Sequence, residues 1–199
     1  MTGTTGGPNA DKRVSPNGLT FLYNREAQKN VSNKPHWPGG SSGVTLGPGY
    51  DLGHRTAAQI VADLTNIGVS AAAAQTLSLA AGKTGEDAKA FVQANSGAVT
   101  LTQAQEEALL NIALPPYEKD VKTYVKVAVN QNQFDAMVSL DYNIGGGNFK
   151  NSSVVANINK GDFAAAAESF KLWNKSGGQV VQGLVNRRNL EVELFNTPV

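Results

Sequence analysis

Apolar residues recur at helical spacing over most of the chain beyond residue 54. The clearest case is residues 57–67, where Ile60, Val61 and Leu64 share one face and Thr56 is placed to cap the N-terminus. Comparable patterns predict further helices at residues 19–29, 70–81, 86–95, 130–142, 152–159, 162–173 and 184–195.

Local signals mark helix ends in the second half of the chain. Thr102 and Gln105 form a capping box at the start of a helix, and Pro115-Pro116 interrupts that helix or starts the next one. The glycine run at residues 145–147 is a natural stop for the helix before it. The pattern as a whole is dominated by helix.

Residues 30–49 differ, because glycine and proline recur there every few positions. Such a composition favours loops and short strands, and Val44-Thr45-Leu46 is the best strand candidate. We therefore expect an α+β protein that is mostly α. A small lobe with short strands, at about residues 18–60, would pack on a helical lobe at about residues 61–199. Residues 1–17 are expected to form a flexible tail.

Composition narrows the classes of function. The 199 residues carry a net charge of +1, so no basic field indicates nucleic-acid binding. Cysteine is absent, which excludes disulfides and cysteine-ligated zinc. His36 and His54 are separated by 18 positions without a carboxylate cluster, so we expect no metal and no cofactor. Without an apolar run of about 18 residues or a signal-peptide pattern, we expect no membrane insertion. We also expect a monomer.

Two carboxylates frame the turn-rich segment. Glu26 lies near the end of the first predicted helix, and no acidic residue separates it from Asp51. Cleavage of a glycosidic bond needs such a pair, because one carboxylic acid protonates the leaving oxygen and a second carboxylate activates water. Spacing alone leaves a structural alternative for each residue: a solvated helix-end carboxylate for Glu26, and a turn residue bonded to its own backbone for Asp51.

A series of motifs in the second half of the chain resembles the C-terminal lobe of phage-type lysozymes, the endolysins. The series is QFDAMVSLDYNIG from residue 133, FKNSS from 149, NKGD from 159, FKLWNKSGG from 170 and GLVNRR from 183. The resemblance covers about residues 131–195 and, with the N-terminal segment, most of the chain from residue 18. It implies a lysozyme-like fold.

The N-terminal segment departs from the commonest endolysin order, which is Glu, then Asp, then Thr. Here Thr45 precedes Asp51 by six positions, an order similar to that of the pesticin-like muramidase domains of bacteriocins. The resemblance implies that Glu26 is the general acid, that Thr45 helps to hold the attacking water, and that Asp51 is the second carboxylate. Thr45 could instead be an ordinary β-branched strand residue. His54 is expected to anchor the hairpin by hydrogen bonds.

The same resemblance implies a saccharide-binding floor near the glycine run. The expected substrate-binding residues are Asn143, Gly145, Gly146, Asn151 and Arg187. Glycine lets backbone groups approach a sugar, and the two asparagines could hydrogen-bond N-acetyl groups. The alternatives are structural, because the glycines could simply end a helix and Arg187 could pair with Glu191 at i,i+4.

These expectations converge on a hydrolase that cleaves the β-1,4 bonds between N-acetylmuramic acid and N-acetylglucosamine in peptidoglycan. Inversion at the sugar is expected over retention, a choice that the separation of the two carboxyl groups decides. The alternative from another class is a non-catalytic peptidoglycan-binding or structural module on a lysozyme scaffold. The chemistry fits a phage endolysin, a bacteriocin or an injected effector. Each would be made in the cytoplasm and delivered to the periplasm, by a holin system for an endolysin. A bacteriocin or effector would also imply an immunity protein.

Overall fold

The computed structural model describes residues 7–199; residues 1–6, part of the expected tail, lie outside it. Contacts divide the chain into two compact units. The hairpin unit is Thr20–Ala113, and the helical unit combines the chain up to Leu19 with Leu114–Val199. This division falls later in the chain than the expected boundary between the lobes, because the helices after the hairpin pack on its core.

The hairpin unit is built around one short antiparallel hairpin. Its elements are α1 (Pro16–Glu26), which begins in the helical unit, β1 (Thr45–Leu46), β2 (Tyr50–Asp51), α2 (Ala57–Asn66), α3 (Ala71–Ser78), α4 (Gly85–Asn95) and α5 (Gln103–Ala113). Thr45 pairs with Asp51 and Leu46 pairs with Tyr50. The turn includes Gly47 with a φ of 61°, in the left-handed region that glycine adopts without strain.

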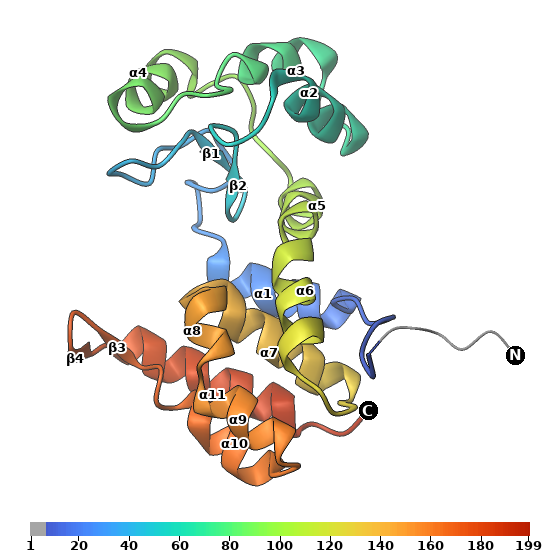
Figure 1. The fold of residues 1–199 in the computed structure, drawn as a ribbon. Coiled ribbons are helices and arrows are strands. Elements are labelled where there is room, and N and C mark those ends of the chain that lie inside the picture. Colours follow the sequence, from blue (N-terminus) through green and yellow to red (C-terminus); the bar gives the residue numbers. More distant parts are fainter. Residues whose placement is uncertain (1–6) are drawn as a thin grey trace, which may run out of the picture. The chain divides into compact units, whose positions relative to one another are not determined.

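The core of this unit joins the strands to the helices that follow them. Val44, Leu46, Tyr50 and Leu52 of the hairpin are fully buried in one cluster with Ile60, Leu64, Leu77 and Leu109. Figure 1 shows α2 and α3 side by side in this unit. Burial of a large apolar side chain contributes about 1.5–3 kcal/mol. Strands of two residues are too short to be stable alone, so this burial holds the hairpin in place.

The helical unit consists of helices packed around α7. Its further elements are α6 (Pro115–Tyr124), α7 (Gln131–Ile144), α8 (Gly146–Lys150), α9 (Ser153–Asn159), α10 (Phe163–Phe170), β3 (Lys175–Ser176), β4 (Gln179–Val180) and α11 (Gln182–Asn196). α11 runs beside α7, and α9 lies beside α10 (Figure 1). The ring centroids of Phe170 and Phe195 are 5.5 Å apart in the core, where Phe134 and Phe149 are also fully buried.

Residues 9–15 are not the free tail that their composition predicted. Asn9 is only 2% exposed, and its Nδ2 donates to the Val127 carbonyl at 2.9 Å. Ser15 donates its backbone N–H and its Oγ–H to the Asp135 carboxylate, at 3.1 and 2.6 Å. The prediction of a flexible tail was therefore wrong for this stretch, because specific polar partners distant in the sequence hold it against the helical unit.

The expectation of a mostly helical α+β protein is confirmed. Gln59 donates its backbone N–H to the Thr56 hydroxyl, and Gln105 does the same to Thr102, as the predicted caps require. α1 starts and ends earlier than predicted, and α8 and the β3–β4 hairpin were not predicted.

Within the described residues, no helix combines the length and apolar character needed to cross a membrane.

Candidate active site

The hairpin places a hydroxyl and a carboxylate opposite each other. Thr45 on β1 and Asp51 on β2 are register partners. The Leu52 N–H donates to the Val44 carbonyl at 2.8 Å, so the neighbouring Thr45–Asp51 pair is of the non-hydrogen-bonded kind. In such a pair both side chains project from the same face, with Cβ atoms about 4.5–5.5 Å apart. The structure therefore brings two of the three expected catalytic residues together.

The Asp51 carboxylate is held in a fixed orientation. Oδ1 accepts from the Gly53 N–H at 2.7 Å, which is the turn bond considered as the structural alternative. Oδ2 lies 2.8 Å from Nδ1 of His54, as expected of a histidine that anchors the hairpin. A Cβ added at Gly43 would collide with Oδ1, so glycine there leaves the space that the carboxylate occupies. These contacts leave a further lone pair on each carboxylate oxygen.

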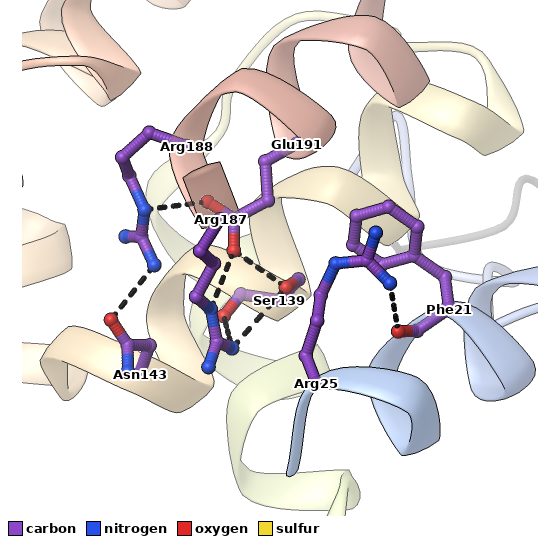
Figure 2. Close-up of polar contacts among 7 residues, drawn as sticks. All are labelled: Phe21, Arg25, Ser139, Asn143, Arg187, Arg188 and Glu191. Atoms are coloured by element: carbon purple, nitrogen blue, oxygen red, sulfur yellow. Dashed lines mark hydrogen bonds and ion pairs between the residues drawn. The ribbon is translucent and has the colours of Figure 1, made fainter. Parts of the chain in front are cut away.

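Glu26 is the last residue of α1 and lies in the same unit as Thr45 and Asp51. Its side chain is half-buried. The turn before it is stiffened by Arg25, whose guanidinium carbon lies 3.3 Å from the centroid of the Phe21 ring. Nη1 of the same arginine donates to the Phe21 carbonyl at 2.6 Å, as Figure 2 shows. Arg25 and Phe21 thus contact each other through the ring and the backbone in the last turns of the helix that carries Glu26.

In the helical unit, Arg187 belongs to a buried polar cluster (Figure 2). Its Nε lies 3.1 Å from Oε1 of Glu191, which is the i,i+4 pair considered as the alternative to substrate binding. The Glu191 carboxylate also accepts from Ser139 Oγ at 2.7 Å and lies 3.0 Å from Nε of Arg188. Burial raises the pKa of Glu191, although the two arginines and the hydrogen bonds oppose this. The cluster ties α11 to α7.

The remaining expected substrate-binding residues lie around the end of α7. Asn143 Oδ1 accepts from Arg188 Nη2 at 2.8 Å, and Asn151 Nδ2 donates to a backbone carbonyl one turn earlier at 2.9 Å. Gly145 has a φ of 82° and ends α7. A Cβ on Gly146 would collide with the carboxylate of Asp120. Both glycines therefore have structural reasons to be glycine, and their role in binding sugar stays a prediction.

Asp141 is a buried acid that the sequence analysis did not single out. It is fully buried, and neither carboxylate oxygen accepts a hydrogen bond from another described residue. Burial, and to a smaller extent the nearby Asp120, raises its pKa to about 7. The signal was available, because Asp141 follows Phe134 by seven positions and Met137 by four, which places it on the apolar face of α7.

Glu106 on α5 was also overlooked. It is only 5% exposed, and it accepts hydrogen bonds from Ser32 Oγ at 2.6 Å and from Tyr23 Oη at 3.1 Å. Its partners are 74 and 83 positions away in the sequence, so no local pattern indicates them. Among residues 7–199, no group of three or more histidines and carboxylates is placed to hold a metal ion.

Comparison with known proteins assigns the chain to a protein family. The phage lysozyme family matches residues 68–191, more than half of the chain. The chain belongs to the phage lysozyme family. The matched segment contains all five expected substrate-binding residues, whereas Glu26, Thr45 and Asp51 precede it. The family therefore supports the C-terminal resemblance more directly than the assignment of the catalytic residues.

Endolysins are among its relatives. The endolysin of Bacillus phage PZA is 48% identical over 97 residues, which are 49% of this chain and 38% of that protein. The SAR-endolysin of Enterobacteria phage P21 is 37% identical over 95 residues, covering 48% of this chain and 58% of that one. The matches thus span between about two fifths and three fifths of the length of these phage lysozyme relatives.

Solved structures confirm the lysozyme-like fold. A crystal structure of a mutant P22 lysozyme superposes with a TM-score of 0.64 and 29% identity, covering 94% of this chain and 99% of that one. The muramidase domain of SpmX from Asticaccaulis excentricus gives a TM-score of 0.63 at 24% identity, with the same two coverages. This second likeness bears on the fold alone.

Proposed function

We propose that this protein hydrolyses the β-1,4 bond between N-acetylmuramic acid and N-acetylglucosamine in peptidoglycan. The observation that carries the proposal is the opposed Thr45–Asp51 pair, within the compact unit that also contains Glu26, in a chain of the phage lysozyme family. A hydroxyl and a carboxylate on one face of a hairpin can together hold a water molecule against a sugar.

Glu26 takes the role of general acid. It ends α1 and is half-buried, and partial burial favours the protonated carboxyl group that a proton donor to the glycosidic oxygen requires. As the bond to the leaving sugar breaks, the proton moves from the carboxyl group to the departing oxygen. The carboxylate that remains is reprotonated from solvent after the product leaves.

Asp51 takes the role of general base, and Thr45 positions the water. The Gly53 N–H and the His54 ring each engage one carboxylate oxygen, which fixes the carboxylate while leaving lone pairs to accept a proton from water. The water then attacks the anomeric carbon from the face opposite the leaving group, so the product has inverted configuration. Inverting enzymes keep the two carboxyl groups about 6.5–9.5 Å apart to leave room for this water.

Residues of the helical unit would contact sugar units of the peptidoglycan strand. Asn143 accepts from Arg188 through Oδ1, which leaves its Nδ2 to donate to an acetamido carbonyl. Asn151, Gly145 and Gly146 would line the same floor. Arg187 is already paired with Glu191. We therefore propose that it both orients neighbouring side chains and contacts the substrate.

The biological role that we propose is lysis of the host cell wall as an endolysin. The named relatives in Bacillus and enterobacterial phages are endolysins and SAR-endolysins, which supports this setting over a bacteriocin or an injected effector. The wall polymer would be the partner that matters for activity. A holin-type system would then give access to the wall, and no immunity protein would be needed.

The test is identification of the products released from purified peptidoglycan. The proposal predicts soluble fragments that end in a reducing N-acetylmuramic acid, detected by mass spectrometry after borohydride reduction. The anomer formed first, observed by NMR, should be the inverted one. Fragments that end in reducing N-acetylglucosamine would refute the bond assignment, and binding to the wall without any new reducing end would favour a non-catalytic module.

A further inference from the structure

A cavity of about 340 Å³ lies in the hairpin unit, between the end of α1, the loop that follows it and the start of α5. It is lined by Tyr23 and Asn24 of α1 and by Ala27, which follows the helix directly. Successive helix residues are about 100° apart, so Tyr23 lies about 60° and Asn24 about 160° around the helix from Glu26. Neither Glu26, Thr45 nor Asp51 lines the cavity, and the proposed reaction gives it no role.

The inner wall of the cavity carries a buried carboxylate. Glu106 is 5% exposed, with Oε1 accepting from Ser32 Oγ at 2.6 Å and Oε2 accepting from Tyr23 Oη at 3.1 Å. All three residues line the cavity. A carboxylate offers about four lone-pair sites, so each oxygen can accept one more hydrogen bond from a ligand. This side of the cavity thus presents a negatively charged hydrogen-bond acceptor whose direction is already fixed.

The loop that forms one side of the cavity is rigid. The Gln28 carbonyl accepts from the N–H groups of Val31 and Ser32, at 2.9 and 3.0 Å. Asn30, which lies between Gln28 and Val31, has a φ of 62°, a left-handed conformation that asparagine tolerates better than most residues. A cavity that is already formed costs little conformational entropy when a ligand binds.

Carboxamide side chains dominate the rest of the lining. They belong to Asn24, Gln28, Asn30, Asn33 and Gln103. Oδ1 of Asn33 is buried and accepts no hydrogen bond from another described residue. Each carboxamide offers two donors and an acceptor, which matches a ligand whose groups also donate and accept. Tyr23 adds an aromatic ring, which provides an apolar surface for the C–H groups of a sugar.

The charges of the lining restrict the ligand. The Glu106 carboxylate disfavours an anion in the cavity, while the Lys29 ammonium at the lining disfavours a cation. A neutral ligand with many hydroxyl and amide groups satisfies both conditions. The volume lies at the lower end of the range for small-molecule sites, which fits one or two sugar units and not a long chain.

We infer that this cavity is a second glycan-binding site, which holds an N-acetylated sugar unit of a peptidoglycan strand through residues other than those that cleave it. This inference rests on the proposed function for the identity of the glycan. Such a site increases the time that the enzyme spends on the insoluble wall. It contributes nothing to a short soluble substrate that only fills the cleavage site.

The test separates wall binding from cleavage. Asn24 and Gln103 are exposed, so an Asn24→Ala, Gln103→Ala double variant removes two sugar contacts with little risk to folding. Gln75→Ala is the matched control, because Gln75 is an exposed residue on α3 of the same unit and does not line the cavity. Binding to purified peptidoglycan is measured by co-sedimentation in a Glu26→Gln background, so that no strand is cut during the assay.

We expect the double variant to bind the wall about tenfold more weakly, from the loss of two hydrogen bonds worth about threefold each, while the control binds like its parent. In the Glu26-containing protein, turnover of a short soluble glycan should be unchanged. Titration with tri-N-acetylchitotriose should shift the NMR side-chain signals of Asn24, Asn30 and Gln103 in the Glu26→Gln protein.

Two results would overturn the inference. One is wall binding by the double variant that equals the control, together with no shift of the three carboxamide signals. The other is an equal loss of activity on wall and short glycan, since the cavity would then act through the cleavage site. Failure of the proposed function looks different: the unmodified protein would release no reducing ends from any substrate, whatever the cavity variants bind.

Discussion

Replacement of Asp141 by asparagine is expected to change how the stability of the protein depends on pH. The carboxyl group is fully buried on α7 and accepts no hydrogen bond from the described residues. Burial first, and the neighbouring Asp120 second, raise its pKa from 3.8 to about 7. The folded protein therefore holds this proton at pH values where the unfolded chain has released it.

The sign and size of the effect of Asp141 on the free energy of unfolding follow from the difference between its pKa values in the folded and unfolded states. Each pKa unit corresponds to about 1.4 kcal/mol, so the contribution of Asp141 to the free energy of unfolding differs by up to about 4 kcal/mol between acidic and neutral pH. The contribution is fully present below pH 3.8 and is lost as the pH rises through about 7. Asparagine carries no charge at any of these pH values, so the variant lacks this dependence.

The assay is urea unfolding of both proteins between about pH 4 and about pH 8, followed by the fluorescence of Trp173 in the same unit. Subtracting the free energy of unfolding of the wild type from that of the variant at each pH cancels the contribution of the other carboxylates. The stability of the variant should rise relative to the wild type by a few kcal/mol across this range, with Glu193→Gln as an exposed control that stays flat. A difference that is constant to about 0.5 kcal/mol would refute the reasoning, because the ionised carboxylate would then be tolerated in place.

Three substitutions probe the proposed catalytic hairpin. Thr45→Glu should abolish normal turnover and give either a covalent glycosyl product or retained stereochemistry, seen by mass spectrometry and NMR; a wild-type rate with unchanged anomer would remove Thr45 from the site. Asp51→Asn should remove the acidic limb of the bell-shaped pH profile and spare the alkaline limb; if the acidic limb persists, another group is the base. Gly43→Ala should lower the rate at least about tenfold by displacing the Asp51 carboxylate and the adjoining backbone of Gly53, whereas Gly97→Ala, where a Cβ meets open space, should not.

The helices could be read from the sequence because their signals are local. The apolar repeat around Ile60 and Leu64, the caps at Thr56 and Thr102 and the stop at Gly145 each act within one or two helical turns. The anchoring of the N-terminal segment could not be predicted from the sequence, because Asn9 donates a hydrogen bond to a carbonyl 118 positions away. Composition predicted a free tail where distant partners decide the structure.

The candidate site was predictable to a similar extent. The strand at residues 44–46 was predicted from its composition, and the hairpin was implied only by the resemblance to phage-type lysozymes. The opposition of Thr45 and Asp51 comes from the register of the hairpin, which the sequence does not state. The fixing of Asp51 by His54 is local. The network around Glu106 joins residues that only the packing of α5 against the loop brings together. The cavity beside it was therefore invisible to any pattern in the chain.

The most direct test of the proposed function compares Glu26→Gln with the wild type on purified peptidoglycan. The amide keeps the shape of the side chain but cannot donate the proton, and general acid catalysis typically contributes about 10² to 10⁴-fold. Glu86→Gln, a substitution at an exposed carboxylate of the same unit, serves as the control. We predict that release of reducing ends falls at least about a hundredfold in Glu26→Gln, with an unchanged melting temperature, and stays at the wild-type rate in the control. Residual activity of Glu26→Gln above about a tenth of wild type would contradict the account.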